Sequence, residues 1–335
     1  MHPELPGETV KFGIWLDFRN PAGRRPWTDV YEETLSLATD AETLGFESVW
    51  LSEHHLTDDG YLPSLFPALA AIAARTSRVR LGTAMVLAGL THPLRLAEDA
   101  AVTDLLSGGR LELGIAPGYR EKEFEALGLD RARRGARTEE TVEILRRAWT
   151  GEPFSYAGNH FAFDDVVVTP VPQSPPPVWI GGGSEAAARR AGRHGLRFLP
   201  DLGTPPEILD LYRRTLAEHG HDPAAFALTA IVTPGVYVCE DAEEGWQEIR
   251  EHYWYLLNKF QEWFGNPGLP SVDDLPRELF LVGPPDVVAE GLRDRIKPLG
   301  DVERVIFFGR APGLPADRAR RSLELFSEHV LPQFA

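Results

Sequence analysis

Residues 79–116 read VRLGTAMVLAGLTHPLRLAEDAAVTDLLSGGRLELGIA and contain one complete strand–helix–strand pattern. The apolar runs at 79–87 and 110–116 predict strands that are buried on both faces. Between them, residues 93–109 have apolar side chains at helical spacing, with a proline at the start and glycines at the end, and these features predict a helix. Two buried strands joined by a helix are typical of a parallel pair.

The same alternation extends along the chain in both directions. The predicted strands are 10–16, 48–52, 79–87, 110–116, 178–182, 196–200, 228–238 and 304–309. The predicted helices are 28–44, 64–76, 93–109, 134–149, 184–194, 205–219, 242–264, 286–298 and 316–330. Eight alternating units without a domain linker predict an α/β fold of the closed (β/α)8 barrel (TIM barrel) type, and not an open doubly wound sheet.

We expect one domain over residues 1–335, with two insertions in the pattern. The first covers 151–177, where YAGN (156–159) suits a hairpin turn and the proline-rich end excludes a helix. The second covers roughly 262–285.

Composition excludes several classes of protein. The 335 residues are 43% hydrophobic and carry a net charge of −16, so neither nucleic acid nor a membrane surface is an expected partner. The single cysteine, Cys239, rules out an intramolecular disulfide and a cysteine-based zinc site. The N-terminal residues show no targeting segment and no apolar run approaches 18 residues, which predicts a cytoplasmic protein.

Three titratable side chains follow the second predicted strand, in SVWLSEHHLTDD (48–59). Active sites of barrels lie at the C-terminal ends of the strands, where Glu53, His54 and His55 are expected. Adjacent side chains in extended backbone point to opposite faces, so the two histidines are poorly placed to share a metal ion, and we expect no metal. One imidazole pointing into the barrel mouth would suit a general base. The alternative is that both histidines only form hydrogen bonds to neighbouring loops.

Two later strand ends are rich in glycine. In WIGGGSEAAARRAG (179–192), Gly181, Gly182, Gly183 and Ser184 lead into a helix and could form a phosphate cradle, the alternative being a tight turn. The G-x-G-x-x-G pattern is not met, since Ala186 replaces its third glycine. In LGIAPGYREKEFEALG (113–128), Tyr119 could stack on a flat ring and Arg120 could meet a phosphate. The alternative is that Arg120 pairs with Glu123 at a helix start.

Aromatic residues are concentrated at 245–264, where we expect most of them to lie in the core and a few to line a pocket for an apolar ligand. The expected substrate contacts are Trp15, His55, Tyr253 and Trp254.

Taken together, VWLSEHHLTDDG, LGTAMVL, the run 91–128, WIGG and SLELFSEHVLPQF resemble the bacterial-luciferase-like flavin-dependent oxidoreductases over residues 10–330. The resemblance implies a (β/α)8 barrel that binds reduced FMN or, in one branch, the deazaflavin F420 at the strand C-termini. It places His54 at the position of the catalytic base, with Glu53 and His55 as its neighbours. It places a non-proline cis peptide at Ala84–Met85, beside Thr83. The cofactor phosphate is placed at the loop Gly118–Tyr119–Arg120 and at the turn from Gly181 to Ser184.

The resemblance has two departures. Pro117 stands where the family pattern has an arginine, and glycines replace side-chain contacts at the second loop, so the choice between FMN and F420 stays open. We expect a monooxygenase that uses reduced FMN and O2 on a small-to-medium organic substrate, with a separate flavin reductase as partner and a homodimeric state. The alternatives are an F420-dependent hydride-transfer enzyme, a non-catalytic flavin-binding protein and a metal-dependent barrel hydrolase.

Overall fold

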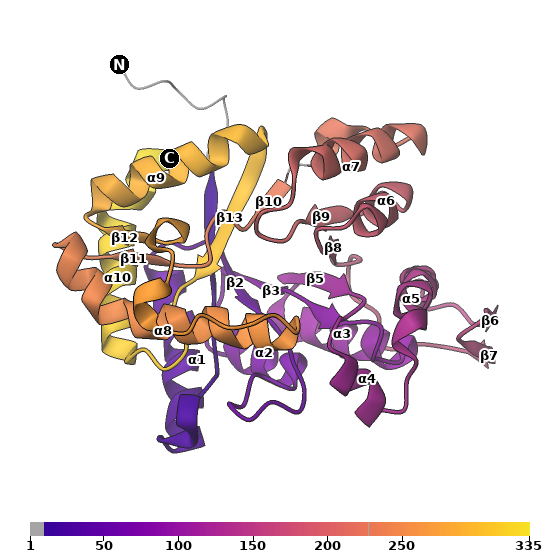
Figure 1. Ribbon diagram of the computed structural model, residues 1–335. Helices are drawn as coiled ribbons and strands as arrows, with labels where there is room; N and C mark the ends of the chain where they lie inside the picture. The colour runs from indigo at the N-terminus through magenta and orange to yellow at the C-terminus, as the bar shows by residue number, and fades with distance from the viewer. Residues whose placement is uncertain (1–9, 227) are drawn as a thin grey trace.

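The computed structural model describes residues 10–226 and 228–335. Eight strands of the nine-stranded central sheet form the barrel (Figure 1), in the order β10–β13–β1–β2–β3–β5–β8–β9. Their bounds are β1 (Lys11–Trp15), β2 (Ser48–Leu51), β3 (Arg80–Thr83), β5 (Leu111–Ala116), β8 (Val178–Gly181), β9 (Arg197–Leu199), β10 (Leu228–Ala230) and β13 (Val302–Phe308). All the pairings are parallel, and only the edge between β9 and β10 lacks ladder hydrogen bonds in the described residues, so the predicted barrel is confirmed as a nearly closed one.

Helices surround the strands, as Figure 1 shows. They are α1 (Trp27–Thr43), α2 (Leu65–Ala73), α3 (Pro93–Ser107), α4 (Glu121–Ala126), α5 (Arg134–Ala148), α6 (Glu185–Arg193), α7 (Pro206–Glu218), α8 (Ala242–Trp263), α9 (Pro285–Ile296) and α10 (Ala316–Leu325). Local sequence explains their ends. The Asp241 side chain accepts two backbone N–H groups at the start of α8, and Gly108, with φ +70°, ends α3.

Three predicted elements differ from the structure. The strand at 79–87 is divided into β3 and β4 (Val86–Leu87) by a cis peptide bond at Ala84–Met85. The strand at 228–238 is also divided, because Pro234 has no N–H to continue the ladder, and β11 (Val236–Val238) pairs outside the barrel with β12 (Leu281–Gly283). The helix at 316–330 changes to a π-helical turn after Leu325.

The two insertions have different structures. In the first, β6 (Phe154–Ala157) and β7 (Ala162–Val166) form the expected hairpin, which extends away from the barrel in Figure 1. The second begins at the C-terminal end of α8 and reaches β12 through two short 3-10 turns. Residues 1–9, where the sequence predicts no targeting segment, lie outside the described residues. Among the helices described, none has a stretch long and apolar enough to cross a bilayer.

The barrel interior holds its own small core. Trp50, Trp179, Leu199 and Ile306 are buried there, with Ala84. Glycines make the room for these large side chains: a Cβ atom at Gly82 would lie 2.2 Å from the Trp50 ring. Likewise, Cβ atoms at Gly114 and Gly181 would each lie 2.6 Å from the Met85 side chain.

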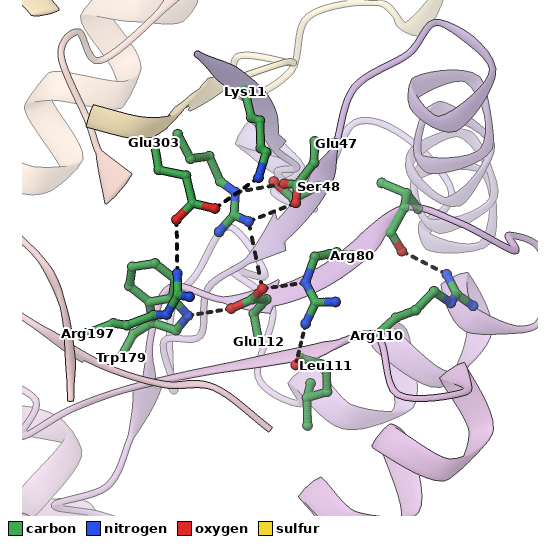
Figure 2. A network of polar contacts seen from close by, with 12 residues as sticks. Lys11, Glu47, Ser48, Arg80, Arg110, Leu111, Glu112, Trp179, Arg197 and Glu303 are labelled. Atoms are coloured by element: carbon green, nitrogen blue, oxygen red, sulfur yellow. Dashed lines mark hydrogen bonds and ion pairs between the residues drawn. The ribbon is translucent and has the colours of Figure 1, made fainter. Parts of the chain in front are cut away.

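A polar network closes the N-terminal end of the barrel below this core (Figure 2). Glu112 accepts a hydrogen bond from the Trp179 indole at 2.6 Å and pairs with Arg80. Arg304 is also buried, forms two hydrogen bonds with Glu47 at 2.7 and 2.8 Å, and lies 3.7 Å from Glu112. Each buried charge in the network has an opposite partner, so removal of one partner would leave the other charge buried and unpaired. The opposite, C-terminal end remains for function.

Candidate active site

His54 lies three residues after β2, at the C-terminal rim of the barrel, and its side chain is buried. Its Nδ1 atom lies 3.0 Å from Oε1 of Glu123, and its Nε2 atom lies 3.3 Å from the Tyr119 hydroxyl. A carboxylate can only accept, so the network assigns the proton to Nδ1 and leaves Nε2 as an acceptor. Burial lowers the pKa of His54, although Glu123 opposes this effect. The imidazole is therefore neutral at pH 7, and its Nε2 lone pair, which accepts the Tyr119 hydroxyl in this structure, is the one that could take up a proton.

Glu123 holds this part of the rim together. It lies on α4, a six-residue helix that follows β5, and its side chain is fully buried. Besides His54, its Oε1 atom accepts the backbone N–H of His55 at 2.8 Å and a guanidinium N–H of Arg120 at 3.0 Å. Burial alone would raise the pKa of Glu123, but these donors and charges lower it overall. Glu123 is therefore ionised and fixes the His54 tautomer and ring orientation.

The residues next to His54 have other functions, as the alternation of faces predicts. Glu53 is buried and accepts the backbone N–H of Leu87 at 2.6 Å, which ties the loop after β2 to β4. Burial raises the pKa of Glu53 to about 7, and the Glu123 charge adds to the rise. His55 is half-buried, and its carbonyl oxygen accepts a hydrogen bond from Arg120 at 2.8 Å.

Aromatic rings cover the imidazole. The ring centroids of Tyr61 and Trp263 lie 4.9 and 4.7 Å from that of His54. The next residue of the chain, Phe264, stacks on Tyr119 at 4.7 Å. Trp263 is the last residue of α8, so the C-terminal end of this helix lies over the candidate base.

The predicted substrate contacts are separated by the structure. Trp15 reaches the site indirectly, because its indole donates to Ser52 at 2.8 Å and Ser52 is hydrogen-bonded to Tyr61. Tyr253 instead stacks on Phe280 at 4.1 Å, and the Trp254 indole donates to the carbonyl of Leu269. The structure thus brings neither of the last two to His54, and their role as substrate contacts stays a prediction.

The predicted cofactor contacts lie along the same rim. The peptide bond between Ala84 and Met85 is cis, as the resemblance implied, and Thr83 hydrogen-bonds both backbone groups of Gly114 through its hydroxyl. Gly118 has φ +82°, a conformation that favours glycine. Arg120 pairs with Glu123 at the start of α4, which is the simpler of the two interpretations, and its contact with a phosphate stays a prediction.

The glycine turn after β8 has donors that are already in use. The N–H of Gly182 donates to the Leu199 carbonyl at 3.2 Å, and that of Gly183 donates to the Asp201 carboxylate at 2.8 Å. Ser184 caps α6 by accepting the N–H of Ala187. A phosphate at this turn would have to replace Asp201, whose pKa is raised by burial.

Two arginines near the rim were missed by sequence reasoning. Arg137 donates to the carbonyl of Gly89 at 2.9 Å, and the Cβ atom of Arg134 packs beside Gly89. Within residues 10–226 and 228–335, no carboxylate forms an ion pair with either guanidinium. Glu123 was recognised only as a partner of Arg120. Its contact with His54 spans 69 positions of sequence, and no local pattern signals it.

Metal ligation finds no support in the geometry. In the part of the chain that the structure describes, no three His, Cys, Asp or Glu side chains gather closely enough to hold an ion.

Comparison with known proteins relates this geometry to a family. The family model described as luciferase-like monooxygenase matches residues 10–301. The oxygenase component of the flavin-dependent trigonelline monooxygenase of Acinetobacter baylyi is 28% identical over 97% of this chain and 96% of its own. The F420-dependent glucose-6-phosphate dehydrogenase of Nakamurella multipartita is 31% identical over 90% of this chain and 92% of its own. The crystal structure of the monooxygenase RslO1 from Streptomyces bottropensis superposes with a TM-score of 0.86, at 30% identity, over 97% of this chain and 100% of that one.

Proposed function

Because this chain belongs to the luciferase-like monooxygenase family, whose members are oxidoreductases, we propose that it is a flavin-dependent monooxygenase with His54 as its base. The observation that carries the proposal is the buried pair of His54 and Glu123 at the C-terminal rim. A neutral imidazole oriented by a carboxylate is suited to accept or return a proton at Nε2. The relatives of the family use either a flavin or F420, and this proposal takes reduced FMN with O2 as its reactants.

The rim residues fit a phosphate-bearing flat cofactor. A side chain at Gly89 would meet the Pro117 carbonyl oxygen at 2.1 Å, so two loops can approach closely there and leave a shallow backbone surface. Arg134 and Arg137 lie beside that surface and would hold the phosphate in place of the arginine that Pro117 replaces. The cis peptide at Ala84–Met85, with Thr83, would support the ring.

When bound, reduced FMN would supply the electrons and the reaction with O2. The chain's own residues would do the rest. His54 would hold or move a proton at Nε2, Glu123 would keep its orientation, and Trp263 with Phe264 would exclude water. Since Trp263 covers the imidazole, this end of α8 has to move before a ring can reach His54. We further propose that a separate reductase supplies the reduced flavin, as the words "oxygenase component" in the name of the trigonelline enzyme indicate for that relative.

Anaerobic titration with reduced FMN and with F420, followed by O2 electrode measurements, tests the proposal. We expect saturable binding of reduced FMN, with O2 uptake that a small-molecule substrate panel increases. Tight F420 binding without FMN-dependent O2 uptake would show that the F420-dependent alternative is right, and the 31% identical dehydrogenase gives that alternative its weight. Unchanged turnover in His54→Ala would remove the base, and no turnover in either protein would favour a non-catalytic flavin-binding protein.

A further inference from the structure

Arg19 is a buried cation at the same rim that no step above uses. It follows β1 by four residues, and its side chain is fully buried. Burial alone would lower its pKa, but the Asp17 carboxylate raises it overall, so the guanidinium is always charged. A buried charge that is kept at this end of a barrel needs a reason.

In the described part of the chain, the pairing of Arg19 leaves the two N–H groups of one guanidinium nitrogen without an acceptor. Its Nε atom donates to Asp17 at 2.8 Å, and its Nη2 atom donates to the same carboxylate. Its Nη1 atom is buried and has no hydrogen-bond partner among the described residues. A buried N–H without an acceptor costs about 1–3 kcal/mol, which a ligand atom could return.

Within the described residues, three other buried side-chain atoms also lack a hydrogen-bond partner, and their positions can be compared with the two ends of the barrel. They belong to Thr229, Arg304 and Glu123. Arg304 lies in the network at the N-terminal end, where its guanidinium faces the Trp50 and Trp179 rings. Arg19 and Glu123 are the two that lie at the functional rim.

The surroundings of Arg19 define the ligand that would meet it. Its guanidinium carbon lies 4.8 Å from the Tyr61 ring centroid and 6.0 Å from that of Phe260. A contact of N–H with a ring is a weak substitute for a hydrogen bond. Tyr61 also contacts His54 and lines an open pocket of about 370 Å³ with Trp27 and Leu56, so the rim stays apolar up to the surface. Since Asp17 already neutralises Arg19, the missing acceptor is best uncharged.

We propose that the Nη1–H group of Arg19 donates a hydrogen bond to an uncharged carbonyl or hydroxyl oxygen on an apolar, flat substrate. The inference rests on the proposed function, because it places that oxygen next to His54 as part of the substrate. Arg19 is then a residue that determines specificity, and it takes no part in holding the cofactor.

Binding of two matched probes tests this role: 2-acetylnaphthalene, which has a carbonyl, and 2-isopropenylnaphthalene, a hydrocarbon in which a methylene group replaces the carbonyl oxygen at the same planar carbon. Their dissociation constants are measured by quenching of protein fluorescence, in wild type and in Asp17→Asn/Arg19→Met, which removes both charges together. We expect the preference for the ketone over the hydrocarbon to fall about tenfold in the double variant, the loss of one hydrogen bond to a charged donor.

Arg110→Met is the matched control. Arg110 is also buried, but it lies at the N-terminal end and all of its donors reach acceptors such as the carbonyl oxygens of Val79 and Ala73. The preference should be unchanged there. Any of three results would overturn the role of Arg19. The preference could fall equally in the control, it could change less than twofold in the double variant, or wild type could bind neither probe.

A measurement on wild type covers the case in which the double variant does not fold. The infrared carbonyl stretch of bound 2-acetylnaphthalene should lie below its value in hexane if Arg19 donates to it, and an unshifted stretch contradicts the inference. Titration with reduced FMN separates the two proposals. If the double variant loses the preference for the ketone but still binds reduced FMN as wild type does, the result bears on the role of Arg19 and leaves the proposed function unchanged. Wild type that binds no reduced FMN overturns the proposed function, whatever the probes do.

Discussion

At the scale of single residues, the candidate site is a set of buried charges with unequal partners. Glu123 accepts hydrogen bonds from three donors through one oxygen atom, whereas Glu53 accepts, among the described residues, only the Leu87 N–H. This inequality explains why the pKa of Glu123 is lowered while that of Glu53 is raised to about 7. Near neutral pH, Glu123 is therefore ionised while Glu53 is still titrating, which allows separate tests.

Glu123→Gln tests the orientation of the base. The amide keeps the size of the side chain but removes the charge that raises the pKa of His54. We expect kcat/KM to fall 10- to 100-fold, because the imidazole is less well oriented, and the acidic limb of the pH–rate profile to move to lower pH. Glu121→Gln is the control, since Glu121 lies on the same helix, is exposed and pairs with Arg131. A profile that moves to higher pH would contradict this account.

Glu53→Gln tests the cost of burying a carboxylate. In the folded chain the Glu53 pKa is about 7, above its ordinary 4.5, so the folded state holds the proton more tightly than the unfolded state. The stability from this group is complete below pH 4.5 and is lost as the pH rises to about 7, by about 3 kcal/mol. Urea unfolding at pH 4.5 to 8 should show the wild type losing stability relative to the variant over this range and no further loss above it. A pH-independent difference would show that the carboxyl is not protonated.

At the scale of elements, α8 combines a structural part and a functional part. Its predicted range, 242–264, agrees with Ala242–Trp263, and Trp246 is a core residue, as expected of most of its aromatic side chains. Tyr253, which we predicted as a substrate contact, is buried in the core as well. Periodicity cannot say which end of such a helix crosses the barrel rim, and so the contact of Trp263 with His54 was not predictable. The six-residue helix α4 was expected only through the alternative in which Arg120 pairs with Glu123 at a helix start, because Phe124 is its only large apolar residue and gives no periodic signal.

Trp263→Ala tests whether this end of α8 competes with the cofactor. The change removes the ring over His54 and the contact between that ring and the Arg120 guanidinium, 4.6 Å from its centroid. If the covered state is favoured by about 1–2 kcal/mol, reduced FMN should bind roughly tenfold more tightly and associate faster. Anaerobic stopped-flow measures both. Trp254→Ala is the control, because Trp254 lies in the same helix but its indole donates a hydrogen bond to the Leu269 carbonyl oxygen. An equal gain in affinity for reduced FMN in this variant would show that the substitution only loosens the helix.

At the scale of the whole molecule, the two ends of the barrel have separate tasks. The alternation of strands and helices was enough to predict all eight barrel strands, because a buried parallel strand has a strong local signal. The direction of the chain after β10 was not predictable, since β10 ends at Ala230 while the apolar pattern continues through Val232 into β11. The single-domain organisation and the homodimer stay predictions.

Glu112→Gln tests this separation. Glu112 is buried between Arg80 and Arg304, so removing its charge should lower the free energy of unfolding by about 3 kcal/mol. Affinity for reduced FMN at a temperature where the variant is folded should not change. Lys11→Gln is the control, because its pair with Glu303 is solvent-exposed and should contribute at most about 1 kcal/mol. Weaker FMN binding with unchanged stability would mean that the network acts on the rim.

The glycines inside the barrel limit how this protein can be re-engineered. Gly82 and Gly114 have no room for even a methyl group, because the Trp50 ring and the Thr83 carbonyl oxygen take up the space beside them, whereas Gly181 is blocked only by the flexible Met85 side chain. Substitutions at Gly82 and Gly114 would therefore be rejected in a directed-evolution library, whatever chemistry is selected. Met85 is the one of the two large side chains that is partly exposed, so a library meant to deepen the cavity for a bulkier ring should vary that position first.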